Sequence, residues 1–154
     1  MIVFAPLRDP VEAINSHLRR AGHAVHCTWI PALGDLGDAL TQLNPEMLIC
    51  QPQADGELSA VAAVRNQLAP QVPLIALLEA ADETAIAGAI AVGARDAVTL
   101  ARPDRLRAVI ERELRSFRLE RALSTTLQSA RDYRKQLETV LQRSNDAIAQ
   151  VQEG

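Results

Sequence analysis

Five short apolar runs alternate with helical patterns along the first two thirds of the chain. An apolar run of about four to eight residues bounded by turn residues is typical of a buried strand, and apolar residues recurring every three or four positions are typical of a helix. The runs predict strands at residues 2–5, 23–30, 47–50, 74–78 and 96–100. The helical spacing predicts helices at 10–21, 35–43 and 58–68, and a fourth that begins at Asp82 or Thr84.

Turn and capping residues separate these predicted elements. Asp9 is a suitable N-cap before Pro10, and Gly22 and Gly93 stand where the first and fourth helices should end. Asn44 with Pro45 stops the second helix. Three leucines of that second helix are expected to face the core: Leu36, Leu40 and Leu43.

Strands that alternate with helices through short connections predict an α/β fold, with a five-stranded, doubly wound parallel sheet. We predict the flavodoxin-like strand order 2-1-3-4-5, followed by a long C-terminal helix. This order places residues 47–50 in the central strand, which reads as a continuous apolar run because both of its faces are buried. Ligands collect where such strands end, so Gln51 is expected to open onto the functional site.

The predicted fourth helix is apolar around most of its circumference, because residues 85–92 contain no charge. A helix of this kind is expected to be buried on more than one side, partly by its own domain and partly by a partner subunit. Ile86 and Ile90 are therefore candidate residues of a second interface. Docking of a different protein on this helix is an alternative.

The last helix is expected to be very long, because no proline or glycine occurs between Asp104 and Gly154. A helix of about 45–50 residues would measure roughly 70 Å. Its first part carries apolar residues that can pack against the sheet. These are Leu106, Val109, Ile110, Leu114 and Phe117.

Beyond Phe117 the apolar spacing of a coiled coil persists over about four heptads. The predicted a positions are Leu127, Arg134, Leu141 and Ile148, and the predicted d positions are Leu123, Ala130, Leu137, Ser144 and Val151. We predict a parallel homodimer of moderate stability, because Arg134 and Ser144 interrupt the seam. A tail that folds back on its own domain is the alternative.

The composition predicts a soluble cytoplasmic protein made of one domain, residues 1–118, and an appended helix, residues 119–154. No apolar run approaches the ~20 residues of a membrane span, and the first residues have no basic leader. Residues 1–103 hold 6 basic and 11 acidic groups, and residues 104–154 hold 10 and 8. Without a clustered basic stripe, neither nucleic acid nor a membrane is an expected partner.

The two cysteines, Cys27 and Cys50, both lie in strand-like runs. We interpret them as small buried hydrophobic residues, with neither a disulfide framework nor a metal-ligand spacing. No cofactor or metal is therefore expected.

Several segments together resemble the receiver domains of two-component response regulators, over roughly residues 1–118. They are residues 44–51, the turn Asp55 and Gly56, residues 72–78 and residues 93–96. The resemblance implies a regulatory signalling domain and not an enzyme. Receivers accept a phosphoryl group on an aspartate, next to a divalent cation held by carboxylates after the first strand. A lysine neutralises the product, and a hydroxyl on the fourth strand reports the modified state.

At the acceptor position this chain carries Gln51, whose amide is not a competent nucleophile for phosphoryl transfer. The acidic pair falls on Ala5 and Pro6, or on Leu7 and Arg8 in a second alignment. Neither alignment supplies the two carboxylates that the cation requires.

The switch positions depart from the receiver pattern as well. The hydroxyl position is Leu78 and the lysine position is Leu100, with Arg102 two residues further on. No acid precedes Asp9 and no lysine precedes Lys135. We therefore interpret residues 1–118 as a pseudo-receiver.

Three alternatives remain open at this point. The first is an atypical phosphoacceptor that uses Asp55 or Asp9. The second is a sensor of a small molecule or nucleotide at the strand ends, although no glycine-rich phosphate loop supports it. The third is an unrelated flavodoxin-like domain whose central strand ends in a polar residue.

Residues 137–154 resemble the leading helix and first strand of a PAS sensor domain. A receiver-like domain, a helical linker and a PAS-like start, in that order, resemble bacterial cyclic-di-GMP signalling proteins of the FimX type, which continue with GGDEF and EAL domains. The resemblance implies that the chain is the N-terminal part of a longer protein. Cyclic dinucleotide in that family is bound by the EAL domain, which this chain does not contain.

Overall fold

Five parallel strands form one sheet in the order β2-β1-β3-β4-β5. The structure is a computed structural model that describes the backbone of residues 1–153 and the side chains of residues 1–147. The strands are β1 (Ile2–Phe4), β2 (Thr28–Ile30), β3 (Leu48–Cys50), β4 (Leu74–Leu77) and β5 (Asp96–Val98). The predicted flavodoxin-like sheet is confirmed.

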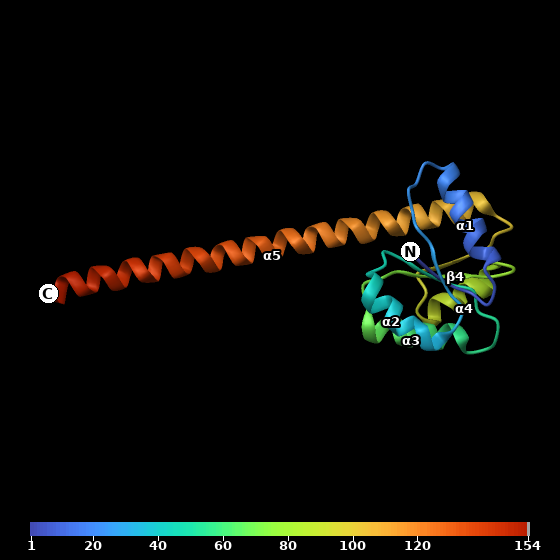
Figure 1. The fold of residues 1–154 in the computed structure, drawn as a ribbon, viewed down its shortest axis with the longest axis horizontal. Coiled ribbons are helices and arrows are strands. Elements are labelled where there is room, and N and C mark those ends of the chain that lie inside the picture. The colour runs from blue at the N-terminus through green and yellow to red at the C-terminus, as the bar shows by residue number, and fades with distance from the viewer. Residues whose placement is uncertain (154) are drawn as a thin grey trace. The chain divides into compact units, whose positions relative to one another are not determined.

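Helices cover both faces of this sheet (Figure 1). They are α1 (Asp9–Arg20), α2 (Leu33–Leu43), α3 (Glu57–Leu68), α4 (Glu83–Val92) and α5 (Pro103–Glu153). α1 and the first turns of α5 pack on one face, and α2, α3 and α4 pack on the other. The chain divides into two compact units, of which the first is Met1–Phe117 and the second begins at Arg118.

Strand β3 shows why the central strand reads as an unbroken apolar run. Leu48 and Cys50 belong to the core beneath α2, α3 and α4, whereas Ile49 belongs to the core beneath α1 and α5. All three side chains are fully buried. Because both faces are covered, no position in the strand can be polar without a buried partner.

The prediction for the second strand is too long, since β2 comprises only Thr28–Ile30 rather than residues 23–30. Strand β1 has three residues, and they pair with Thr28, Trp29 and Ile30. His23 lies outside the sheet. Its backbone N–H donates to the Leu18 carbonyl at 3.0 Å, and its Nε2 atom lies 2.8 Å from Glu111 Oε1.

The predicted N-cap of the first helix is wrong by one residue. Arg8 occupies the N-cap position, and Asp9 is the first helical residue. The Arg8 carbonyl accepts hydrogen bonds from the backbone N–H groups of Val11 and Glu12, at 3.0 and 3.3 Å. The helix ends as expected, because Gly22 follows it with a positive φ of 86°.

In α2, Leu36 and Leu40 are buried as predicted, but the prediction for Leu43 is wrong. Leu43 is 51% exposed because it is the last residue of the helix. Asn44 follows it in a left-handed conformation, with a φ of 45°, and redirects the chain.

Helix α4 is less buried in the single chain than its apolar sequence predicts. Ala89 is its one buried residue, Ile86 is half-buried, and Ile90 is 50% exposed. The helix packs against α3 and β5 through a small part of its surface. Its own domain therefore covers little of the helix, and the expectation that a partner subunit covers the rest stays a prediction.

Asp96, at the start of β5, anchors the first turns of α5 to the sheet. Its Oδ1 atom accepts hydrogen bonds from the Ala97 backbone N–H at 2.8 Å and from Arg105 at 3.0 Å. Its Oδ2 atom accepts one from Arg112 at 3.1 Å. Burial raises the pKa of Asp96, but these hydrogen bonds and the charge of Arg105 outweigh it and hold the pKa below its usual value.

The long last helix is present as predicted. Leu106, Ile110 and Leu114 are buried in the first unit, whereas the apolar side chains within residues 119–147 are exposed. Among the described residues, none of the helices has both the length and the apolar content that crossing a membrane requires.

Candidate functional site

The carboxyl edge of the sheet brings Gln51 next to Ala5. The Gln51 backbone N–H donates to the Phe4 carbonyl at 2.8 Å, which extends the pairing of β1 and β3 by one residue. The Ala5 backbone N–H donates to the Ile30 carbonyl at 3.3 Å, on the other side. The positions that the resemblance gives to a phosphoacceptor and to an acidic residue are thus neighbours, occupied by an amide and a methyl group.

Trp29 completes this corner of the sheet. Ala5 is fully buried, and its carbonyl accepts a hydrogen bond from the indole Nε1 of Trp29 at 2.9 Å. Mg²⁺ requires several oxygen ligands, and one backbone carbonyl that is already hydrogen-bonded does not provide them. Within residues 1–147, no three His, Cys, Asp or Glu side chains come together in a way that could hold a metal ion.

The residues after Ala5 lie at the surface. Pro6 is exposed, Leu7 is 65% exposed, and the Arg8 side chain forms a solvent-exposed ion pair with Glu12 at 3.8 Å. The second alignment therefore places no carboxylate next to Gln51 either.

Leu78 and Thr99 lie opposite each other at the ends of β4 and β5. The Leu78 backbone N–H donates to the Val98 carbonyl at 2.8 Å. The buried Thr99 hydroxyl donates to the Glu79 carbonyl at 3.1 Å and accepts from the Ala101 backbone N–H at 3.3 Å. Thr99 is not among the predicted site residues. Its signal in the sequence is a single polar residue in an apolar run, and its hydrogen bonds hold two loops together.

The remaining candidate residues lie on separate elements. Leu100 is half-buried against the core beneath α1 and α5, while Arg102 is exposed at the turn before α5. Asp55 is exposed in the turn before α3, and Asp9 is exposed at the start of α1. The structure thus brings together Gln51 and Ala5, and it leaves these carboxylates at the surface.

Cys50 precedes Gln51 and is the nearest alternative nucleophile in sequence. Its side chain is fully buried. Burial, with a smaller contribution from the charge of Glu57, raises the pKa of the Cys50 thiol to about 12. A thiol with this pKa is neutral at physiological pH and is not an activated nucleophile.

We expect Cys50 to resist modification in the folded protein. With Cys27→Ser removing the other thiol, Ellman's reagent at pH 8 should modify Cys50 at least roughly 100-fold more slowly in buffer than in guanidinium chloride. The matched control is Cys50→Ala, in which the half-buried Cys27 should react faster than Cys50 does. Equal rates for Cys50 in the folded and unfolded protein would contradict this environment.

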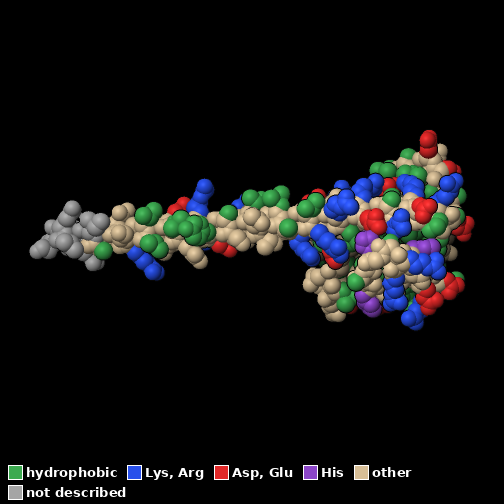
Figure 2. All heavy atoms as spheres, turned by 90° about the horizontal axis from the view of Figure 1, so that it is seen from above, with side chains coloured by type: hydrophobic (Ala, Val, Ile, Leu, Met, Phe, Trp, Pro, Cys, Tyr) green, Lys and Arg blue, Asp and Glu red, His purple; other side chains and the backbone are tan. Residues whose placement is uncertain are grey.

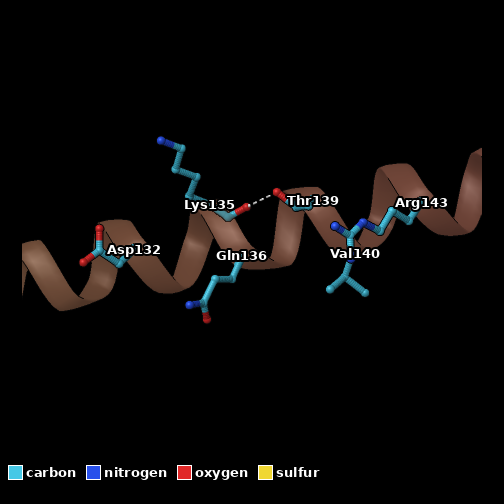
Figure 3. Close-up of a pocket in the computed structure, with 6 residues that line it drawn as sticks. All are labelled: Asp132, Lys135, Gln136, Thr139, Val140 and Arg143. Carbon is cyan, nitrogen blue, oxygen red and sulfur yellow. Dashed lines mark hydrogen bonds between the residues drawn. The ribbon is translucent and has the colours of Figure 1, made fainter.

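A surface hollow on α5 is not a second site (Figure 3). Six residues line it, and all belong to this one helix: Asp132, Lys135, Gln136, Thr139, Val140 and Arg143. The Thr139 hydroxyl donates to the Lys135 carbonyl at 3.0 Å within the same helix. The hollow is therefore the space between neighbouring side chains.

The predicted coiled-coil positions lie on the exposed surface of α5. Those with described side chains are Leu123, Leu127, Ala130, Arg134, Leu137, Leu141 and Ser144, and all of them are exposed. The side chains of Ile148 and Val151 lie outside the described residues. Figure 2 shows hydrophobic side chains recurring along α5 among charged ones.

Solved structures with a similar fold include receiver domains. The receiver domain of NtrX from Brucella abortus matches with a TM-score of 0.62 and 20% identity, over 74% of this chain and 97% of that domain. The receiver domain of NtrC4 from Aquifex aeolicus matches with a TM-score of 0.60 and 14% identity, over 76% and 97%. NtrX in complex with ADP matches with a TM-score of 0.66 and 22% identity, over 80% of this chain and 28% of NtrX.

The fold is thus of the flavodoxin-like α/β class. Within that class, the chain has the fold of response-regulator receiver domains. No family model and no curated protein matches the sequence.

Proposed function

We propose that this chain is a phosphorylation-incompetent, receiver-like regulatory module. The observation that carries the proposal is the amide of Gln51 at the end of β3, next to the methyl group of Ala5. An amide nitrogen is not a competent nucleophile for phosphoryl transfer, whereas a carboxylate is. The receiver scaffold is retained, and the residues that carry its chemistry are replaced.

The charges around the strand ends support the same proposal. A phosphoryl group adds between about −1.5 and −2 charges at neutral pH, and a nearby cation must offset them. The first lysine of the chain is Lys135, and Leu100 and Leu78 occupy the positions of the receiver lysine and hydroxyl. We therefore propose that the module is not an enzyme and acts without a cofactor or metal.

The output of the module is mechanical in this proposal. Two copies associate through the exposed apolar positions of α5, and the helices lead into PAS, GGDEF and EAL domains of a cytoplasmic cyclic-di-GMP signalling protein. A change in receiver packing alters the pitch or register of the coiled coil. Arg134 and Ser144 interrupt its apolar seam, so the coiled coil is only moderately stable and can change its geometry. Ile86 and Ile90 on α4 offer a second surface for the homodimer or for a protein partner.

The fluorescence of Trp29 provides a direct test. Trp29 is the only tryptophan of the chain, and its indole N–H donates a hydrogen bond to the Ala5 carbonyl next to Gln51. We expect millimolar Mg²⁺ with beryllofluoride, a phosphoryl mimic, to leave its fluorescence unchanged. Gln51→Asp alone should also give no response, because Ala5 and Pro6 still supply no carboxylate. A saturable response of the native chain would contradict the proposal. Its loss in Asp55→Asn or Asp9→Asn would identify an atypical phosphoacceptor.

A further inference from the structure

The apolar surface of α5 is wider than the predicted seam requires. Leu119, Tyr133 and Val140 are 64%, 64% and 60% exposed, as exposed as Leu123 and Leu141 at 60% and 63%. None of these three is an a or d position of the predicted seam. A two-stranded coiled coil needs two apolar positions per heptad, whereas residues 127–133 of this helix present three, namely Leu127, Ala130 and Tyr133.

The additional positions generate a second coiled-coil seam. The first seam consists of Leu123, Leu127, Ala130, Arg134, Leu137, Leu141 and Ser144. The second seam consists of Leu119, Leu123, Thr126, Ala130, Tyr133, Leu137, Val140 and Ser144, and it keeps the same alternating spacing of three and four. Both seams share Leu123, Ala130, Leu137 and Ser144, so either one forms without a shift along the helix.

Each seam is the more favourable one at a different position along the helix. In the first seam, Arg134 places two like charges at the interface of a parallel dimer. In the second seam Tyr133 takes that place, and Arg134 moves to the edge, where its guanidinium can reach water. Further along the helix the preference is reversed. There the first seam contains Leu141 and the second seam contains Val140, and the larger leucine side chain fills the interface better. Neither seam is apolar throughout.

A second copy of this chain is the occupant that fits this surface. The residues from Arg118 onward hold 6 basic and 5 acidic groups, a net charge of +1, so repulsion between two copies is weak. The charged residues that flank the first seam, Arg131 and Glu138, have opposite signs and face uncharged residues of the partner in a parallel pair. An identical helix also offers the same two seams, so both copies can rotate together and keep a symmetric interface.

We propose that α5 carries two overlapping seams for a second copy of the chain, and that the dimer switches between them by rotation of each helix. Consecutive residues of an α-helix are separated by about 100°, so the centre of the seam moves by roughly 50°. This inference rests on the dimer of the proposed function. It adds a defined two-state element through which the receiver unit can act on whatever follows α5.

Disulfide cross-linking of the full chain tests the rotation. Three variants each carry one new cysteine. Leu137→Cys should cross-link in both seams, Leu141→Cys in the first seam, and Val140→Cys in the second seam. Thr139→Cys, on the opposite side of the helix, and the unsubstituted chain with Cys27 and Cys50 give the background. Each protein is oxidised with copper phenanthroline, and the linked dimer is quantified on non-reducing gels.

We expect cross-linking above background at all three seam positions. Adding Arg134→Leu removes the charge from the first seam, and should raise the ratio of Leu141→Cys to Val140→Cys cross-linking by roughly fivefold. Background cross-linking of Val140→Cys, or a ratio that Arg134→Leu leaves unchanged, overturns the two-seam inference while the dimer stands. Background cross-linking of Leu137→Cys overturns the parallel dimer itself.

Discussion

Leu137→Asp is expected to convert the proposed dimer into a monomer. Leu137 belongs to both proposed seams of α5 and is 46% exposed in the single chain, so the substitution would remove an apolar contact from each copy whichever seam is formed. It also places two carboxylates opposite each other across the interface. Loss of a buried leucine pair and addition of like charges should raise the dissociation constant by at least roughly 100-fold.

Sedimentation equilibrium of the native chain and the variant measures this effect. Thr139→Asp is the matched control, because it adds the same charge two residues away on the opposite side of the helix. The control should remain dimeric. A native chain that is monomeric at high micromolar concentration, or a Thr139→Asp variant that dissociates as readily as Leu137→Asp, would refute the proposed interface.

Asp96→Asn is expected to destabilise the first unit by about 2 kcal/mol. The amide retains an acceptor for the Ala97 N–H, but it loses the charge that Arg105 and Arg112 contact at 3.0 and 3.1 Å. Breaking a fully buried pair costs about 3–5 kcal/mol. The side chains of Arg105 and Arg112 are 42% and 54% exposed, so solvent screens their charges and the expected loss in the free energy of unfolding is smaller.

The effect of Asp96→Asn should depend on pH. The pKa of Asp96 is lowered in the folded protein, so its contribution to stability is fully present above the unfolded pKa of about 3.9. That contribution is lost as the pH falls through the lower, folded pKa. The stability difference between native chain and variant should therefore be constant near neutrality and shrink below about pH 4.

Urea denaturation followed by Trp29 fluorescence, at pH 7 and at pH values below 4, measures both expectations. The matched control is Asp55→Asn, which neutralises an exposed carboxylate and should change the free energy of unfolding by less than about 0.5 kcal/mol. If Asp96→Asn lowered the free energy of unfolding by as little as the control does, the anchoring role would be contradicted. A loss that persists unchanged at low pH would contradict it as well.

Elements whose pattern reflects burial on both faces were predictable from the sequence. Residues 47–50 form an uninterrupted apolar run because α helices cover both sides of β3, and this fixed the centre of the sheet. The long helix α5 was predictable for a different reason, since no proline or glycine interrupts residues 104–153. In both cases the local pattern alone determines the element.

Features that depend on distant partners were not predictable. The length of β2 is set by the three residues of β1 with which it pairs, and the exposure of Leu43 by the left-handed turn at Asn44. The share of α4 that its own domain buries was not predictable either, because residues 85–92 carry no charge that would mark the exposed side.

The position of Gln51 at the end of β3 was predictable, but its surroundings were not. Gln51 follows directly from the position of the central strand. The hydrogen bond from Trp29 to the Ala5 carbonyl and those of Thr99 depend on which side chains adjacent strands bring together. A strand that is buried on both faces has no alternation of apolar and polar residues, so its sequence does not specify which residues of the neighbouring strand it pairs with.

Phosphorylation with radiolabelled acetyl phosphate tests the central claim most directly. The native chain and Gln51→Ala are incubated with Mg²⁺ and the label, and incorporation is compared before and after hydroxylamine, which cleaves acyl phosphates. Because an amide occupies the end of β3, we predict the same background incorporation in both proteins, without sensitivity to hydroxylamine. Incorporation into the native chain that hydroxylamine removes would contradict the account.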